Sequence, residues 1–267
     1  MSTTRAPAVA GLFYPGDAAE LIATVDELLE QAADIHASDP TSPVPKAIIA
    51  PHAGYIYSGP VAATAYRLLR AQRQHITRVA IFGPSHRVAF RGLAVPGVDK
   101  FATPLGEIAL DTNAIKQLLQ LPQVHSLDQA HNQEHSLEVQ LPFLQRVLDN
   151  FSLIPVVVGD ASAADVAAAI NMLWDDRGTL IVISSDLSHY HDYRTAQHMD
   201  QHTSKAIEQL QAEHIDYEDA CGRNPLIGLL QVARQRGLGA ATIDLRNSGD
   251  TAGNKDSVVG YGAYVIH

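Results

Sequence analysis

The sequence predicts a single α/β domain over residues 1–267, with a central, largely parallel sheet flanked by helices. Short apolar runs alternate with longer segments whose apolar residues recur at helical spacing, which is typical of strand–helix–strand units. Most of these runs are continuously apolar, as expected for strands that are covered on both faces. A length of 267 residues also fits one large domain.

The element boundaries follow from this pattern. The expected strands are 46–50, 78–83, 153–158, 179–184, 241–245 and 258–266. The expected helices are 17–33, 60–69, 137–148, 163–174, 193–211 and 226–236, with Asp17 as the N-cap of the first. The stretch 88–110, interrupted by Gly and Pro, predicts a small β insertion, the Pro-rich segment 37–45 predicts a loop, and 219–222 a break.

Charge and cysteine content exclude several classes of protein. The formal net charge is -10 and no block of Lys or Arg occurs, which argues against a nucleic-acid partner. With Cys221 as the single cysteine, no intrachain disulfide can form, which fits a reducing compartment. The N-terminus does not resemble a signal peptide, and the apolar runs are far shorter than the roughly 20 residues of a membrane helix. A cytoplasmic protein without membrane contact is expected.

Histidine and aspartate follow several predicted strands directly. His52 comes after the first strand, His86 after the second, Asp186 and His189 after the strand at 179–184, and Asp250 after the strand at 241–245. Ligands of open α/β sheets sit beyond the carboxyl ends of the strands. Neutral imidazoles that converge with a carboxylate form a site for Fe(II), Zn(II) or Cu(II). A lone histidine more often only caps a helix, but several at successive strand ends favour a site.

A second group of polar residues lies in the segment AHNQEHSLE. His135 and Glu138 are three residues apart and share a helix face if a helix starts nearby, so they could form an acid/base unit or support the site. A solvated helix start is the alternative interpretation.

Tyr55 precedes the helix expected at 60–69, whose first N–H groups could hold an anion, although a simple N-cap would explain this start as well. Glu138 and Tyr55 are therefore candidate substrate-binding residues. Cys221 lies away from every strand end and is expected to be structural.

Several motifs, in order along the chain, resemble the Memo family. They are RAPAVAGLFYP at 5–15, APHAGY at 50–55 with YSG at 57–59, GPSH at 83–86, EHSLE at 134–138 with QLP at 140–142, SSDLSH at 184–189 and GY at 260–261. The resemblance spans nearly the whole chain. Its bacterial and archaeal branch is also called AmmeMemoRadiSam system protein B, and that name implies AMMECR-type and radical-SAM proteins as candidate partners.

The resemblance also implies a fold and a site. The family is similar in fold to class III extradiol ring-cleaving dioxygenases, whose iron is held by two histidines and a carboxylate. His52 and His86 match the two metal histidines of the family, and His135, Asp186 and His189 match further pocket residues, the candidate catalytic groups.

The third metal ligand departs from the family pattern. In animal members it is a cysteine, and alignment from Gly260-Tyr261 puts Thr251 at that position, next to Asp250. A threonine hydroxyl is a poor ligand for a soft metal. Asp250 is therefore the expected third ligand, and a set of two histidines and one carboxylate favours Fe(II), with Zn or Cu as the other possible ions.

Three functions are compatible with these residues. The first is a dioxygenase-like, iron-dependent oxidoreductase acting on a small molecule. The second is a metal-dependent hydrolase that uses metal-bound water. The third is a non-catalytic protein that binds a small molecule or peptide in a retained pocket, because fold does not fix function.

Overall fold

The computed structural model describes residues 2–32, 45–174 and 178–267. Its central sheet contains nine strands. Four parallel strands form the middle, in the order β2 (Ala47–Ala50), β9 (Thr179–Ser184), β3 (Arg78–Pro84) and β8 (Ser152–Val158). The central residues of all four strands are apolar and buried, which confirms the α/β fold that the sequence predicts.

On both sides of these four strands, the next strand of the sheet runs antiparallel. On one side β12 (Val258–Ile266) pairs antiparallel with β2, β10 (His189–His191) and β11 (Ala240–Asn247). On the other side β4 (Leu93–Val95) runs antiparallel to β8 and parallel to β7 (Val124–Ser126). The strands expected at 241–245 and 258–266 therefore exist, but they form an antiparallel pair, which needs only a short connection.

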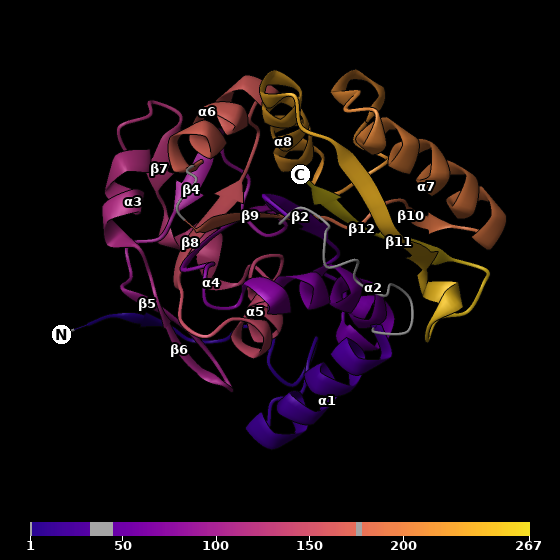
Figure 1. Cartoon of the computed structure of the whole chain (residues 1–267), viewed down its shortest axis with the longest axis horizontal. Coiled ribbons are helices and arrows are strands. Elements are labelled where there is room, and N and C mark those ends of the chain that lie inside the picture. The colour runs from indigo at the N-terminus through magenta and orange to yellow at the C-terminus, as the bar shows by residue number, and fades with distance from the viewer. Residues whose placement is uncertain (1, 33–44, 175–177) are drawn as a thin grey trace.

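Helices cover both faces of this sheet. In Figure 1, α6 (Ala163–Leu173), α8 (Arg223–Arg236) and α7 (Tyr193–Glu208) lie on one side, and α1 (Ala18–Gln31), α2 (Tyr55–Leu68) and α5 (Leu141–Val147) on the other. The shorter α3 (Thr112–Leu118) contacts α6 and β8, and α4 (Asp128–Asn132) contacts β4. Buried side chains from both layers join in one hydrophobic core.

The insertion expected at 88–110 contributes to two sheets. β4 joins the central sheet, whereas β5 (Lys100–Thr103) and β6 (Gly106–Ala109) form a hairpin that β1 (Thr4–Arg5) extends into a three-stranded sheet. Four short 3-10 helices lie within the described residues: η2 (Leu69–Gln72), η3 (Glu138–Gln140), η4 (Ala212–His214) and η5 (Ser248–Asp250). No helix of the described residues is long and apolar enough to cross a membrane.

Helix boundaries differ from the sequence prediction in four places, one of them α8, which begins at Arg223 rather than at 226. Asp17 caps α1 as expected, accepting hydrogen bonds from the N–H groups of Ala19 and Glu20. Helix α2, however, begins at Tyr55 and carries Pro60 inside it, so Pro60 did not mark the helix start. The helix expected at 137–148 begins as η3, and α7 ends three residues before 211. The loop expected at 37–45 lies outside the described residues except for Pro45.

Candidate metal centre

Three histidines from distant parts of the chain meet at the carboxyl edge of the parallel strands. His52 follows β2, His86 follows β3, and His135 lies in the loop after α4. One ligand atom from each lies within 4.8 Å of the others. The ring centroids are 5.1 Å apart for His52 and His86, 5.5 Å for His52 and His135, and 4.5 Å for His86 and His135. This histidine group could hold a metal ion.

A hydrogen-bond chain fixes the tautomer of His52. The hydroxyl of Ser184 donates its only proton to the carbonyl oxygen of Ser136 at 2.6 Å, because a carbonyl can only accept. Ser184 Oγ also accepts from Gln140 Nε2 at 2.7 Å, so toward His52 Nδ1, at 2.9 Å, it can act only as an acceptor. His52 Nδ1 therefore carries the proton, and its Nε2 presents a lone pair.

The buried carboxylate of Glu134 fixes the tautomer of His86 in the same way. Glu134 Oε1 accepts from His86 Nδ1 at 2.8 Å and from the Ser136 N–H at 2.9 Å, and Oε2 accepts from the His86 N–H at 2.6 Å. Burial acts to raise the pKa of Glu134, but these hydrogen bonds and the nearby charge of His86 lower it to about 2. Glu134 is thus an anion that holds the proton on His86 Nδ1. Such a carboxylate–histidine pair is the usual support of a metal-ligating imidazole.

Two imidazoles of this group, those of His52 and His135, stay neutral. Burial, together with repulsion from His86 and His135, lowers the pKa of His52 well below its usual range. Burial and the proximity of His86 also lower the pKa of His135, to about 4. Neutral imidazoles with free lone pairs are the form that binds Zn, Cu and Fe. The donor set of these residues therefore fits a transition metal.

Asp186 and His189 lie beside the histidine group. Asp186 follows β9, and its Oδ1 accepts from the backbone N–H of His52 at 2.6 Å. Burial raises the pKa of Asp186 to about 7, although the bond from His52 acts to lower it. His189 opens β10; burial lowers its pKa, and its charge would interact with that of His86. Asp186 can thus exchange a proton near neutral pH close to the site, and His189 can act there as a neutral base.

The structure does not bring Asp250 into the histidine group. Its side chain is exposed, Oδ1 accepts from the Tyr193 hydroxyl at 2.5 Å, and Oδ2 accepts from the Asn247 N–H at 3.0 Å. The latter bond is part of a capping box on η5, so Asp250 stabilises a turn. Thr251, at the aligned family position, donates to the Ser248 carbonyl at 3.2 Å. In the described part of the chain, His135 takes the place expected for Asp250.

The two candidate substrate-binding residues are both engaged in the interior. Tyr55 is buried, and its hydroxyl donates to the Val139 carbonyl at 2.6 Å. Glu138 is buried in an ion pair with Arg5 at 2.7 Å, and its oxygens also accept from the Tyr14 hydroxyl and from two backbone N–H groups. These contacts attach the N-terminal segment to the loop that carries His135. A substrate-binding role for either residue remains a prediction.

Cys221 lies at the site, contrary to the expectation that it is remote. Its Sγ is 3.2 Å from His52 Nε2, the nitrogen with the free lone pair. No sequence pattern indicates this contact, because Cys221 precedes α8, far along the chain from every strand end that carries a histidine. The sequence prediction also includes no separate role for Glu134 and Ser184, although both lie in the motifs that carry the family resemblance.

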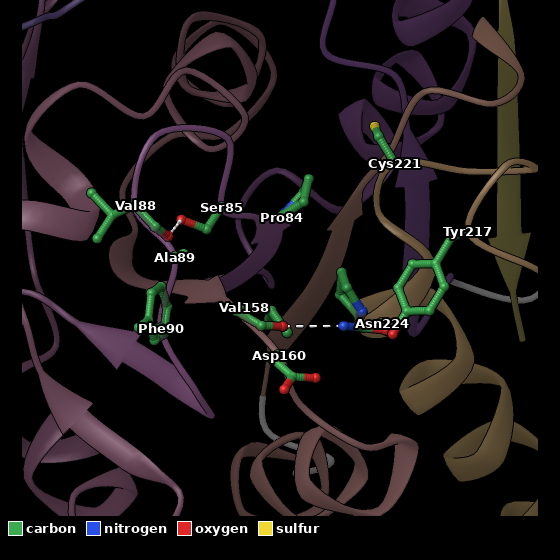
Figure 2. Close-up of a pocket in the computed structure, with 12 residues that line it drawn as sticks. Pro84, Ser85, Val88, Ala89, Phe90, Val158, Asp160, Tyr217, Cys221 and Asn224 are labelled. Atoms are coloured by element: carbon green, nitrogen blue, oxygen red, sulfur yellow. Dashed lines mark hydrogen bonds between the residues drawn. The ribbon is translucent and has the colours of Figure 1, made fainter.

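A cavity of about 330 Å³ lies beside the histidine group. Figure 2 shows Cys221, Tyr217 and Asn224 on one side of it and Ser85, Val88 and Phe90 on the other. Ser85 is the chain neighbour of His86, and Cys221 contacts His52, so the cavity adjoins the site at two points. Its size suits a small molecule, and its lining is partly aromatic.

Comparison with known proteins identifies the family. A family model described as Memo-like protein matches residues 5–265. The chain belongs to the Memo-like family. A MEMO1 family protein of Aquifex aeolicus is 35% identical, with 96% of this chain and 97% of the relative covered. Others are those of Methanobrevibacter smithii, 34% identical over 98% of this chain and 99% of the relative, and Thermotoga sp., 36% identical over 96% and 97%.

A second buried carboxylate, that of Asp200, holds the loop that carries Asp186 and His189 by a hydrogen bond. Asp200 of α7 is 2% exposed, and its Oδ1 accepts from the Ser188 N–H at 3.0 Å. Burial raises the pKa of Asp200 to about 6, although the bonds from Ser188 act to lower it. The folded protein therefore keeps a proton on Asp200 that the unfolded chain loses above about pH 4.

Asp200→Asn is expected to change how stability depends on pH. Because the folded pKa is raised, this group's contribution is fully present below about pH 4 and is lost as pH rises through 6. The variant lacks this loss, so its free energy of unfolding relative to wild type should increase by about 3 kcal/mol between pH 4 and pH 7. Urea unfolding of metal-free protein at both pH values measures it. If the free energies of unfolding of Asp200→Asn and wild type differ by the same amount at both pH values, the raised pKa of Asp200 is contradicted.

Proposed function

We propose that this protein is a metal-dependent, dioxygenase-like oxidoreductase that acts on a small molecule beside an Fe(II) ion held by His52, His86 and His135. The observation that supports this most is the pair of fixed tautomers. Ser184 and Glu134 each hold the Nδ1 proton of one histidine, which leaves both Nε2 lone pairs free for one ion. When bound, iron supplies one-electron chemistry with dioxygen.

The remaining tasks fall to the protein's own groups. Asp186, with a pKa raised to about 7, can hold or release a proton at neutral pH. His189 stays neutral, because burial lowers its pKa, and can accept a proton from a substrate hydroxyl. The adjoining cavity brings Phe90 and Tyr217 against a bound molecule and limits its size.

One observation favours a hydrolase as the second candidate. The histidine group of the described residues contains three imidazoles and no carboxylate. Three histidines around zinc, with water in the fourth position, form a site that activates the bound water as a nucleophile. The cavity, Asp186 and His189 would serve that reaction equally well.

Metal content and dioxygen uptake distinguish these functions. The protein is purified with and without air, its metals are measured, and dioxygen consumption is followed with a panel of small dihydroxylated aromatic compounds. About one iron per chain and substrate-dependent dioxygen uptake are expected. Zinc with ester or amide hydrolysis supports the second candidate, and a site that takes up no metal supports a non-catalytic binding protein.

Glu134→Ala is expected to weaken metal binding without touching a ligand. The change removes the acceptor that fixes His86 Nδ1, and loss of such a partner typically lowers metal affinity by about 10–100-fold. Glu134→Gln keeps an acceptor oxygen and is expected to fall between the variant and wild type. Titration with zinc against a competing chelator measures the affinities. Equal affinity in all three proteins contradicts the supporting role of Glu134.

A further inference from the structure

Tyr190 has a backbone conformation that bulky residues rarely adopt. Its φ is +64°, in the left-handed region, which is disfavoured for every residue except glycine. In the described part of the chain, Leu210 is the other non-glycine residue with a positive φ. Strained backbone of this kind gathers at functional sites, where the surrounding structure imposes it. Tyr190 directly follows His189, one of the groups of the candidate site.

The conformation of Tyr190 belongs to a β-bulge in β10. His189 pairs with Val259 of β12, and His191 pairs with Val258, so Tyr190 is an extra residue in the ladder. Bulges with a left-handed residue usually have glycine there. Because neighbouring residues of a strand face opposite sides, the extra residue turns His189 and His191 to opposite sides of the sheet. The bulge thus decides which side His189 faces.

The ring of Tyr190 is exposed beside the site. The residue is 78% exposed, and its ring stands at 67° to that of His189, with 5.7 Å between the ring centroids. His189 is close enough to His86 for their charges to interact. Burial and the nearby Asp186 raise the pKa of Tyr261, and Tyr190 adds to the increase, so both residues lie on one side of the site.

The side chain of Tyr190 does little for the folded protein itself. Among the residues that the structure describes, none forms a hydrogen bond with its hydroxyl, and its ring contact is the edge-on one with His189. Packing therefore does not explain why a tyrosine, rather than a glycine, occupies a left-handed position. A contact with a bound molecule does explain it, because an exposed aromatic ring offers a flat apolar surface at a small cost in conformational entropy.

We propose that Tyr190 is a specificity-determining residue whose exposed ring stacks on a planar ring system of the molecule that binds beside the metal. This inference rests on the proposed function and names the class of ligand, a molecule with an extended, flat and unsaturated ring system. Aromatic pairs in stacked or edge-to-face geometry gain free energy beyond the area that they bury. The bulge serves this contact and the orientation of His189 together.

The proposal predicts that loss of the ring separates binding from stability. Tyr190→Ala removes the ring and keeps a Cβ atom in the left-handed region, whereas Tyr190→Gly removes both. Relief of the strained φ should offset the larger conformational entropy of glycine in the unfolded chain. Tyr190→Gly should therefore unfold at the same or a higher urea concentration than wild type, and at a higher one than Tyr190→Ala.

Binding is measured with two probes that present the same pair of hydroxyl groups to the metal. Zinc-loaded, full-length protein, in which the ion undergoes no redox change, is titrated with catechol and with the dihydroxynaphthalene that has both hydroxyls at the β positions of one ring. Wild type and Tyr190→Phe should prefer the two-ring probe. That preference should fall by about 3–10-fold in Tyr190→Ala and Tyr190→Gly, with zinc content unchanged.

The outcomes distinguish this inference from the proposed function. Equal preference in all four proteins overturns the inference, and so does wild type that binds neither probe. A Tyr190→Gly protein that loses zinc or is less stable than Tyr190→Ala also overturns it, because the ring would then serve the fold. If the preference is found with zinc but iron-loaded protein consumes no dioxygen, Tyr190 keeps its role and the oxidoreductase is wrong.

Discussion

Replacing His135 with alanine is expected to abolish stable metal binding while the protein stays folded. The histidine group loses one of its three imidazoles, and removal of a ligand should lower affinity by at least the factor of about 100 seen for supporting residues. His135 suits this test because its buried Nδ1 makes no hydrogen bond, and the nearby Glu134 Oε1, 3.5 Å away, keeps its bonds from His86 and Ser136 when His135 is removed. Metal content after dialysis should fall from about one ion per chain to none.

Two further variants make the result specific. His125 is exposed, and His125→Ala should keep the full metal content. Asp250→Ala should also keep it, because that carboxylate is used by Tyr193 and Asn247. If Asp250→Ala loses the ion and His135→Ala retains it, the set of two histidines and one carboxylate predicted from the sequence is the correct one.

Among the substitutions considered, Glu138→Ala is expected to lower the free energy of unfolding most. Glu138 is 1% exposed, and the change leaves the buried guanidinium of Arg5 without its counter-ion. It also removes the acceptor for the Tyr14 hydroxyl and for the backbone N–H groups of Ala8 and Val9. Breaking a buried ion pair from one side typically destabilises a protein by about 3–5 kcal/mol.

Chemical unfolding monitored by circular dichroism measures this effect. Glu138→Gln keeps the shape and one acceptor oxygen, so its loss should be smaller. Glu107→Ala removes an exposed partner of Lys100 and is expected to leave the unfolding midpoint unchanged. A Glu138→Ala protein as stable as wild type would mean that Arg5 is not held by this carboxylate. Because the same contacts attach the N-terminal segment to the His135 loop, metal affinity should fall together with stability.

The sequence by itself determined the layered fold and two of the three histidines. Apolar runs such as those of β3 and β9 are typical of parallel strands with helices on each side of the sheet, so their order along the chain predicts the architecture. His52 and His86 follow such strands directly, and the carboxyl ends of parallel strands meet at one edge. Local pattern was therefore enough to place them together.

Only the tertiary structure decided which groups complete the site. Asp250 follows a strand as His52 does, but β11 is an antiparallel edge strand, and its end lies at a capped turn away from the histidine group. His135 reaches the site from a loop, and Cys221 reaches it from the turn before α8. The periodicity of apolar residues in the sequence does not predict such contacts between loops. Strand position follows from hydrophobic pattern, whereas the meeting of loops depends on packing between residues far apart in the chain, such as Gly222 against Ser185.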